Sequence, residues 1–318
     1  MTSQIREAIE HHSTNWSPSI AEIFVQLYGQ FHHDQKLSAK YAAIVKENIP
    51  YGPHERNVLD LYLPVDAVSS PRGVFCYMHG GGLVGGDKSL YKGSLYANIG
   101  RYFASHGFVV AVMNYRLVPG VTYPGGGEDV QLVREWIYNN ISKSEYGNGD
   151  PERVVLAGHS AGGLHIATNL YAAGDPDRQS RDPLFPPLAG VIYLSTPFGF
   201  ASLLEFRRPA LIGYYEEEER IRVVCPVGLL ETLPEGSPVL DPKILPTLIV
   251  AGQYDPKEIQ DPVFQFIDRY RKKTPQGLLP EVSAVAGHNH LSHVCSIGTE
   301  DDVLGRIMLE FIVKVCSK

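Results

Sequence analysis

Apolar runs that end in turn residues recur along this chain of 318 residues, and segments with helical periodicity separate most of them. The runs include GVFCYMHG (73–80), FVVAVMNY (108–115), RVVLAGHS (153–160) and LAGVIYLS (188–195). A continuous apolar run of this kind is typical of a strand that is buried on both faces of a parallel sheet. The alternation of such strands with helices predicts an α/β fold, with a mostly parallel central sheet and helices on both faces.

The same periodicity assigns most of the remaining chain. Strands are expected at residues 41–45, 57–64, 246–256 and 279–288, and helices at about 15–40, 90–105, 129–141, 162–173, 262–272 and 303–315. The sequence contains no repeat and no low-complexity tract. We therefore expect a single domain over residues 1–318.

One segment, residues 196–243, breaks the alternation. It is too long for an ordinary connection between a strand and a helix, and its apolar content is too high for a disordered segment. We expect it to form a helical insertion over the carboxyl edge of the sheet. Together with about residues 1–45, it is expected to form a helical cap that shapes a substrate pocket.

Charge and hydropathy argue against several classes of partner. The formal net charge is −7, which does not favour binding to nucleic acid or to an anionic membrane. The first residues lack the continuous apolar stretch of a signal peptide, and the longest apolar runs are too short to cross a bilayer. The four cysteines form no C-x-x-C pair. We expect a cytoplasmic protein without a nucleic-acid or membrane partner.

The stretch AGHSAGG contains the pattern G-x-S-x-G, with Ser160 between Gly158 and Gly162. It follows the predicted strand RVVL and precedes the helix expected at 162–173. A serine on such a sharp turn presents its hydroxyl at the edge of the sheet, and the flanking glycines let neighbouring backbone approach closely. This context favours a nucleophilic Ser160 over an ordinary turn.

A second glycine-rich motif, HGGG at residues 79–82, ends an earlier strand, where its loop would face Ser160 across the carboxyl edge. Acyl transfer develops negative charge on a carbonyl oxygen, and preorganised N–H groups stabilise that charge. Glycines permit the exposed backbone and the positive φ angles that such a site requires. We predict an oxyanion hole formed by the amides of Gly80, Gly81 and Ala161.

These paired motifs resemble the hormone-sensitive-lipase-like esterase branch of the α/β-hydrolase superfamily, and they are similar to the bifunctional feruloyl/acetyl esterase and kynurenine-formamidase-like groups. The resemblance runs from Asn57 to the C-terminus and includes NVLDLYLP, MHGGGLVGGDKS, NYRLVPGVTYPGGGEDV, GHSAGG and AGQYDP. The stretch NYRLVPG departs from the family because it lacks the commoner aspartate and glutamate. The resemblance implies an α/β-hydrolase fold with a helical cap and a Ser-His-Asp triad.

A serine nucleophile needs a base, and the base needs an acid that orients it. In this superfamily the chain order is serine, acid, histidine. The family places its acid at the end of a strand that here reads IVAGQYDP, which implies Asp255. Asp261 is the nearest competitor, but it falls where a helix is expected to begin.

The stretch VAGHNHLSH offers three candidates for the base: His288, His290 and His293. The family pattern G-x-x-H with an apolar residue next matches His290 and Leu291, so we predict His290 as the base. His288 is the second candidate, and His293 is expected to be a structural or surface residue. The stretch also resembles the H-x-H-x-D-H metal-ligand set of metallo-β-lactamase-fold hydrolases, but Ser292 stands where that family has aspartate. We expect neither a metal ion nor a cofactor.

The sequence therefore predicts a serine hydrolase of the carboxylesterase kind, which cleaves small carboxylic esters with a short or aromatic acyl part through an acyl-enzyme. Its partner would be a small-molecule ester, and a homodimer is compatible with the sequence. Two alternatives stay open. One is a formamidase, lactonase or thioester hydrolase on the same triad. The other is a non-catalytic small-molecule receptor, against which the presence of all three triad residue types speaks.

Overall fold

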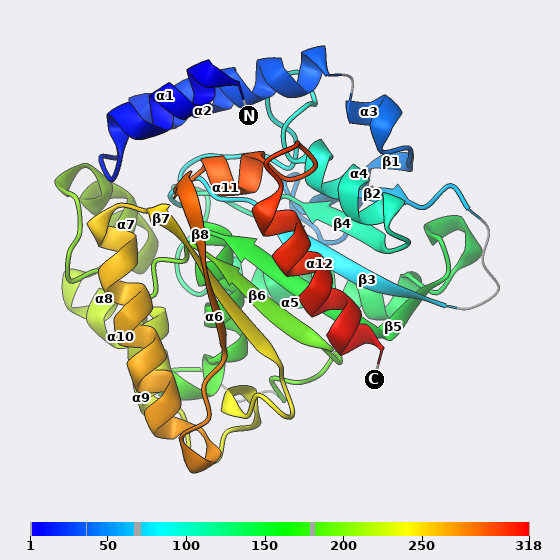
Figure 1. Cartoon of the computed structure of the whole chain (residues 1–318). Helices are drawn as coiled ribbons and strands as arrows, with labels where there is room; N and C mark the ends of the chain where they lie inside the picture. Colours follow the sequence, from blue (N-terminus) through cyan, green and yellow to red (C-terminus); the bar gives the residue numbers. More distant parts are fainter. Residues whose placement is uncertain (1, 36, 67–70, 179–181, 318) are drawn as a thin grey trace.

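The protein folds around one twisted sheet of eight strands, and helices cover both faces of this sheet (Figure 1). The structure is a computed structural model that describes residues 2–35, 37–66, 71–178 and 182–317. The strand order is β1-β2-β4-β3-β5-β6-β7-β8. The pairs β1/β2 and β2/β4 are antiparallel, and the other neighbouring strands run parallel. The predicted mostly parallel α/β sheet is confirmed.

The eight strands agree with the predicted ones to within a few residues at most ends. Their bounds are β1 (Ile44–Pro50), β2 (Val58–Leu63), β3 (Arg72–Met78), β4 (Val109–Met113), β5 (Gly149–His159), β6 (Gly190–Leu194), β7 (Thr247–Tyr254) and β8 (Glu281–Asn289). The main helices are α1 (Ser3–His12), α2 (Pro18–Asp34), α3 (Leu37–Lys40), α4 (Ala97–Ser105), α5 (Gly125–Asn140), α6 (Ala161–Leu170), α7 (Arg208–Tyr215), α8 (Glu218–Val224), α9 (Pro226–Thr232), α10 (Lys257–Lys273), α11 (Ser292–Cys295) and α12 (Val303–Cys316).

Successive side chains of a strand point to opposite faces of the sheet, and β3 shows how this divides the core into two layers. Val74, Cys76 and Met78 pack with α5, α6, α7, α9 and α10 on one face. Phe75 and Tyr77 pack with α4 and α12 on the other face. Because all five side chains are buried, β3 is a central strand with no solvent-exposed face.

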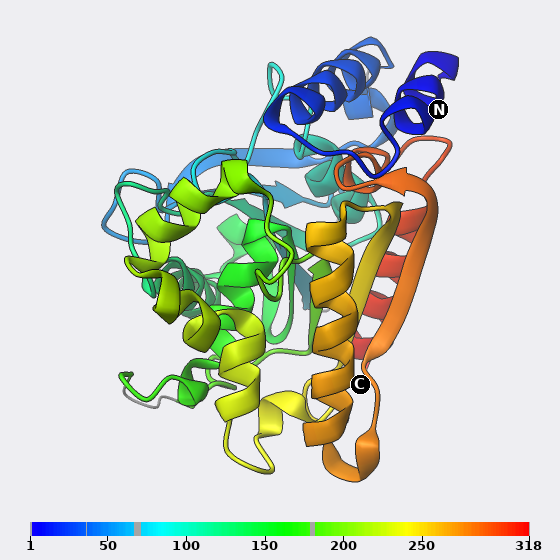
Figure 2. The same ribbon diagram turned by 90° about the vertical axis from the view of Figure 1, so that its left-hand side faces the viewer.

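Two segments outside these layers lie near the carboxyl ends of the strands. In Figure 2, α1 and α2 (blue) lie above the tips of β7 and β8, and the insertion with α7 and α8 (yellow-green) stands beside the sheet. The N-terminal helices have a small core of their own, in which Phe24 and Tyr28 pack against Leu291 and Cys295. The expected helical character of residues 196–243 is confirmed over α7, α8 and α9.

The helix expected from residue 90 begins only at Ala97, because the preceding residues adopt a non-helical backbone. Tyr91, Lys92 and Tyr96 all have positive φ angles, between 46° and 66°. Such angles are incompatible with a right-handed helix. Apolar spacing could not reveal this, since the turn depends on contacts with other parts of the chain.

A buried ion pair attaches the glycine-rich loop after β3 to the sheet. Lys88 Nζ lies 2.9 Å from Asp60 Oδ1 in β2, and both side chains are less than a tenth exposed. The same oxygen accepts a hydrogen bond from the backbone N–H of Asn48. A lysine and a carboxylate are tolerated in the interior only when they are paired in this way.

We expect Lys88→Met to lower the free energy of unfolding by about 3–5 kcal/mol, because it leaves the buried Asp60 carboxylate without its cation. The exposed Lys92, four residues further on, provides the matched control: Lys92→Met should change stability by less than about 0.5 kcal/mol. Urea unfolding followed by circular dichroism measures both. Equal stabilities of the two variants would contradict this account of the loop.

Candidate active site

Ser160 lies at a sharp turn between β5 and α6, with φ 52° and ψ −119°. The surrounding glycines leave no room for side chains. A Cβ on Gly158 would lie 2.4 Å from the backbone nitrogen of Gly163, and a Cβ on Gly162 would lie 2.5 Å from the carbonyl oxygen of Met78. A positive φ on a serine costs free energy and is retained where the surroundings enforce it. The strand, turn and helix thus have the geometry expected of a nucleophile elbow.

The structure brings Ser160, His290 and Asp255 together in one hydrogen-bonded row. Ser160 Oγ lies 3.0 Å from His290 Nε2, and His290 Nδ1 lies 2.9 Å from Asp255 Oδ1. Asp255 is fully buried, and the other two are at most 5% exposed. Since an ionised carboxylate only accepts hydrogen bonds, we assign the proton on His290 to Nδ1. That leaves Nε2 free to accept the serine proton.

Asp261, the competing acid, does not reach a histidine. It lies inside α10, and its Oδ2 accepts a hydrogen bond from Ser202 Oγ at 2.7 Å. The expectation that a helix begins at Asp261 is wrong, because α10 already starts at Lys257 and continues through Pro262.

A second serine and a second histidine lie on the other side of the Asp255 carboxylate. Ser195 Oγ donates to Asp255 Oδ2 at 2.6 Å and lies 2.6 Å from His293 Nε2. Burial is the main reason that the pKa of His293 lies well below its usual value, so this ring is neutral. Because the Ser195 hydroxyl already donates its proton, we assign the single N–H of His293 to Nε2, where it donates to Ser195.

Geometry distinguishes these two serine–histidine pairs. In the first pair the acid binds the histidine, which in turn faces the serine. In the second pair Asp255 binds the Ser195 hydroxyl directly, and no acid among the described residues bonds to His293. Ser195 is fully buried, whereas Ser160 lines two cavities. A substrate carbonyl can therefore approach Ser160.

The remaining histidines near the site have different partners. His288 Nδ1 lies 3.2 Å from Ser292 Oγ, and His288 Nε2 lies 3.5 Å from Asp301 Oδ2, so the three histidines of residues 288–293 face different groups. Within the described ranges, no group of three or more His, Cys, Asp or Glu side chains is arranged to hold a metal ion. His159 Nε2 lies 2.7 Å from the carbonyl oxygen of His290. This contact connects the elbow to the segment of residues 288–293, which we call the histidine loop.

The glycine-rich loop after β3 packs directly against the elbow. A Cβ on Gly80 would lie 2.7 Å from His159 Nδ1 and 3.1 Å from Ser160 Cβ. The His79 side chain contacts the same loop: its Nδ1 lies 2.7 Å from the carbonyl oxygen of Gly80. Gly81 and Gly82 both have positive φ, at 143° and 62°. The motif is therefore a tightly packed loop beside Ser160.

Two cavities meet at Ser160. The first, about 30 Å³, is lined by Ser160, Ala161 and Gly82 together with apolar side chains that include Leu164, Leu203 and Leu211; we call it the slot. The second, about 490 Å³, contains His290, Trp16, Phe206 and the loop Gly80–Gly82; we call it the groove. Both cavities are lined by Ser160, Gly82 and Arg207.

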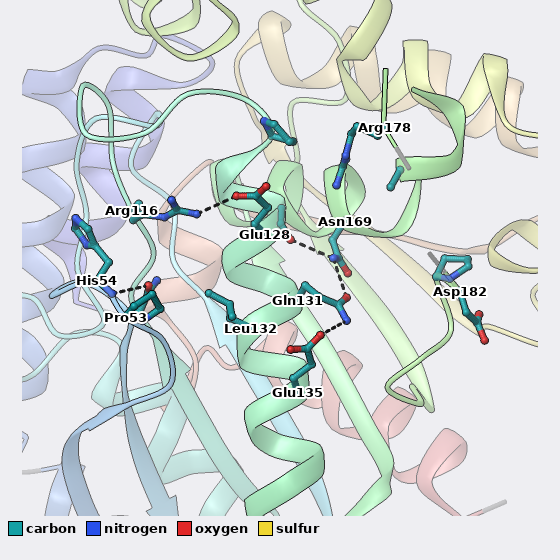
Figure 3. Close-up of a pocket in the computed structure, with 15 residues that line it drawn as sticks. Pro53, His54, Arg116, Glu128, Gln131, Leu132, Glu135, Asn169, Arg178 and Asp182 are labelled. Carbon is teal, nitrogen blue, oxygen red and sulfur yellow. Dashed lines mark hydrogen bonds and ion pairs between the residues drawn. The ribbon is translucent and has the colours of Figure 1, made fainter. Parts of the chain in front are cut away.

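A larger cavity of about 710 Å³ lies elsewhere on the molecule. Figure 3 shows it between His54, Arg116 and helix α5, with Glu128 pointing toward Arg116 and Gln131 toward Asn169. Its lining includes neither Ser160 nor any histidine of residues 288–293. The size of a cavity is therefore not what identifies the candidate site here.

Several residues at the site carried no signal in the sequence. Trp16, between α1 and α2, packs edge-on against the His290 ring with 5.0 Å between ring centroids. Ser195 and His293 surround the acid, and Arg207 borders both the slot and the groove. Trp16, Ser195 and Arg207 belong to no recognisable motif, and only the fold brings them to the site. His293, expected to be a structural or surface residue, is fully buried beside the acid. Gly82, the last glycine of HGGG, also lines both cavities.

Comparison with solved structures shows the same fold in known esterases. Esterase B from Lactobacillus rhamnosis, crystallised with a C6-C4 SN3 inhibitor, matches with a TM-score of 0.68 at 17% identity, over 95% of this chain and 97% of that one. Esterase 2 from Thermogutta terrifontis matches with a TM-score of 0.57 at 21% identity, over 86% and 92% of the two chains. The sheet and these likenesses show that the protein has the α/β-hydrolase fold.

Comparisons of the amino-acid sequence with known families and proteins find esterase relatives. Residues 59–179 match the family model BD-FAE. A probable isoprenylcysteine alpha-carbonyl methylesterase from Oryza sativa subsp. japonica is 39% identical over 127 residues, which are 40% of this chain and 28% of that protein. Esterase LipC of Mycobacterium tuberculosis is 30% identical over 138 residues, 43% and 32% of the two chains. This chain thus covers about a third or less of the length of each relative. The matches support the predicted resemblance to the hormone-sensitive-lipase-like esterase branch.

Among the described residues, no helix has the length and apolar character needed to cross a membrane.

We expect Ser195→Ala to lower kcat about tenfold and to leave KM within about threefold, because Asp255 Oδ2 loses a charge-assisted donor and retains the Gly252 N–H. The acid then holds His290 less firmly, whereas the substrate cavities do not change. Ser202→Ala, which removes a hydroxyl bonded to the remote Asp261, is the matched control and should leave kcat unchanged. Steady-state kinetics on one activated ester measures both. A folded Ser195→Ala protein with wild-type kcat would contradict this role.

Proposed function

We propose that the protein is a serine hydrolase of small carboxylic esters, with Ser160 as nucleophile, His290 as general base and acid, and Asp255 as the acid that orients His290. The observation that carries this proposal is the row from Ser160 Oγ to His290 Nε2 at 3.0 Å and from His290 Nδ1 to Asp255 Oδ1 at 2.9 Å. This row has the order and spacing of an acyl-transfer triad.

The proposed reaction has two halves. Ser160 Oγ attacks the ester carbonyl carbon while its proton passes to His290 Nε2, and the tetrahedral intermediate collapses when Nε2 returns that proton to the leaving alcohol oxygen. Water then attacks the acyl-enzyme, its proton passes to Nε2, and the carboxylic acid leaves as Ser160 regains the proton. Asp255 stabilises the imidazolium in both halves. The Nδ1 hydrogen bond keeps Nε2 directed at Ser160 throughout.

The amides of Gly80, Gly81 and Ala161 are proposed to stabilise the oxyanion, and we add Gly82 as a further candidate. Support comes from the packing of Gly80 on Ser160, from the positive φ of Gly81 and Gly82, and from the exposure of Gly81. Each such donor contributes about 10²–10³ in rate. Ala161 is the first residue of α6, so its amide has no partner within the helix.

The two cavities suggest how an ester would lie. The general acid must reach the leaving-group oxygen, so the alcohol part belongs on the side of His290. His290 lines the groove and does not line the slot. We therefore assign the groove to the alcohol part and the slot to the acyl part. With about 30 Å³, the slot has room for a short acyl chain only.

We assign residues 1–45 and 196–243 as the cap of this single hydrolase domain. Trp16 and Val25 from the first segment and Phe206 and Ala210 from the second line the groove beside Ser160. Esters are the proposed substrates because relatives carry esterase names; a formamide, lactone or thioester would use the same row of residues. A cytoplasmic location is part of the proposal.

Ser160→Ala should lower kcat about 10⁶-fold on 4-nitrophenyl acetate, since triad serines contribute about this much. His290→Ala should lose at least about 10³-fold in kcat/KM, and His288→Ala should lose far less. Circular dichroism verifies that each variant is folded. Retention of a tenth of the wild-type rate by Ser160→Ala, or loss of activity in Ser195→Ala alone, would place the nucleophile elsewhere.

The slot predicts a limit on acyl length. With 4-nitrophenyl esters, kcat/KM should be highest between acetate and butyrate and at least tenfold lower for octanoate. Leu211 is buried in the wall of the slot, and its neighbour Ile212 is exposed. Leu211→Ala should therefore raise the ratio of hexanoate to acetate kcat/KM several-fold, whereas Ile212→Ala should leave it unchanged. An unaltered ratio in Leu211→Ala would show that the acyl part lies elsewhere.

A further inference from the structure

A charged pair lies in the otherwise apolar slot. Arg207 and Glu258 are the only charged side chains among the described residues that line it. Arg207 Nε lies 2.6 Å from Glu258 Oε1, with side-chain exposures of 20% and 4%. Glu258 Oε2 accepts a further hydrogen bond from the backbone N–H of Leu204. The carboxylate therefore has partners for both of its oxygens.

The guanidinium of Arg207, in contrast, has N–H groups that bond to no side chain among the described residues. A guanidinium carries five N–H groups in a fixed planar fork. Among the described residues, only the Nε of Arg207 has a side-chain partner, and both terminal nitrogens lack one. Arg207 Nη1 lies 2.9 Å from the point where a Cβ on Gly82 would stand, so this end of the group lies over the glycine-rich loop. Arg207 lines both cavities at Ser160, so these donors without a side-chain partner lie beside them.

A purely structural role explains this arrangement poorly. Burying an ion pair costs desolvation free energy that its own attraction barely offsets, and well-packed apolar residues often stabilise as much. The slot is rich in leucine, which would suit a plain hydrocarbon acyl chain without any charge. An acyl chain that ends in a hydrogen-bond acceptor would instead bind the terminal Nη groups of Arg207.

We propose that the slot selects acyl groups that end in a carboxylate, so that the preferred substrates are monoesters of short dicarboxylic acids, with Arg207 as the residue that binds the free carboxylate. Glu258 holds the Nε edge of the guanidinium and leaves the Nη end for the substrate. Its negative charge also weakens the attraction for that substrate. This inference rests on the proposed esterase function and names the substrate class for the same site.

The test compares monomethyl succinate with methyl butyrate, which share a four-carbon acyl chain and a methanol leaving group and differ in the terminal group. The measured quantity is the ratio of their kcat/KM values, followed by release of methanol. Arg207→Met should lower this ratio at least tenfold, as expected for the loss of one charge-assisted hydrogen bond. Arg207→Lys should retain part of the ratio, because the cation remains.

Two further variants sharpen the result. Glu258→Gln should raise the ratio several-fold, because the competing negative charge is gone; a structural pair would show no such rise. Arg208, the next residue, is largely exposed and pairs with Glu218, so Arg208→Met should leave the ratio unchanged.

A ratio in folded Arg207→Met within twofold of the wild type would overturn the inference. If the wild type hydrolyses neither these esters nor 4-nitrophenyl acetate, the proposed function itself fails.

Discussion

The candidate site depends on one buried carboxylate and the donors that converge on it. Asp255 Oδ1 faces His290 Nδ1, and Asp255 Oδ2 accepts from Ser195 Oγ and from the backbone N–H of Gly252. These contacts bring together the ends of β6 and β7 and the loop after β8. A buried carboxylate without such donors would be too costly to keep ionised. With them, it fixes the ring of His290 in front of Ser160.

The parallel sheet explains why these groups meet. Ser160, Ser195 and Asp255 each follow the carboxyl end of a strand, and β5, β6 and β7 are neighbours in the sheet. The carboxyl ends of parallel strands lie at one edge of the sheet, where the rigid strands hold the loops that contain the functional residues. His159 and Gly80 add the close packing that joins the elbow to the glycine-rich loop and to the histidine loop.

Much of this could be predicted from the sequence, because the relevant signals are local. The apolar runs located the central strands. The glycines around Ser160 and in HGGG mark close backbone contacts, both within the elbow, as between Gly158 and Gly163, and between the two motifs, as between Gly80 and Ser160. Trp16, Ser195, Arg207 and the contact of His293 with Ser195 could not be predicted, since the partners lie far away in the sequence. The choice between His288 and His290 depended on a family pattern, because both precede the same short helix, α11.

The central claim is that Ser160 is the residue that attacks the substrate. The most direct measurement is mass spectrometry of the intact and digested protein after treatment with a fluorophosphonate, which modifies activated serines. We expect one adduct per chain, on the peptide that contains Ser160, and no adduct on that peptide in Ser160→Ala. An adduct on Ser195, or an unmodified protein under conditions that label a known serine esterase completely, would contradict the account.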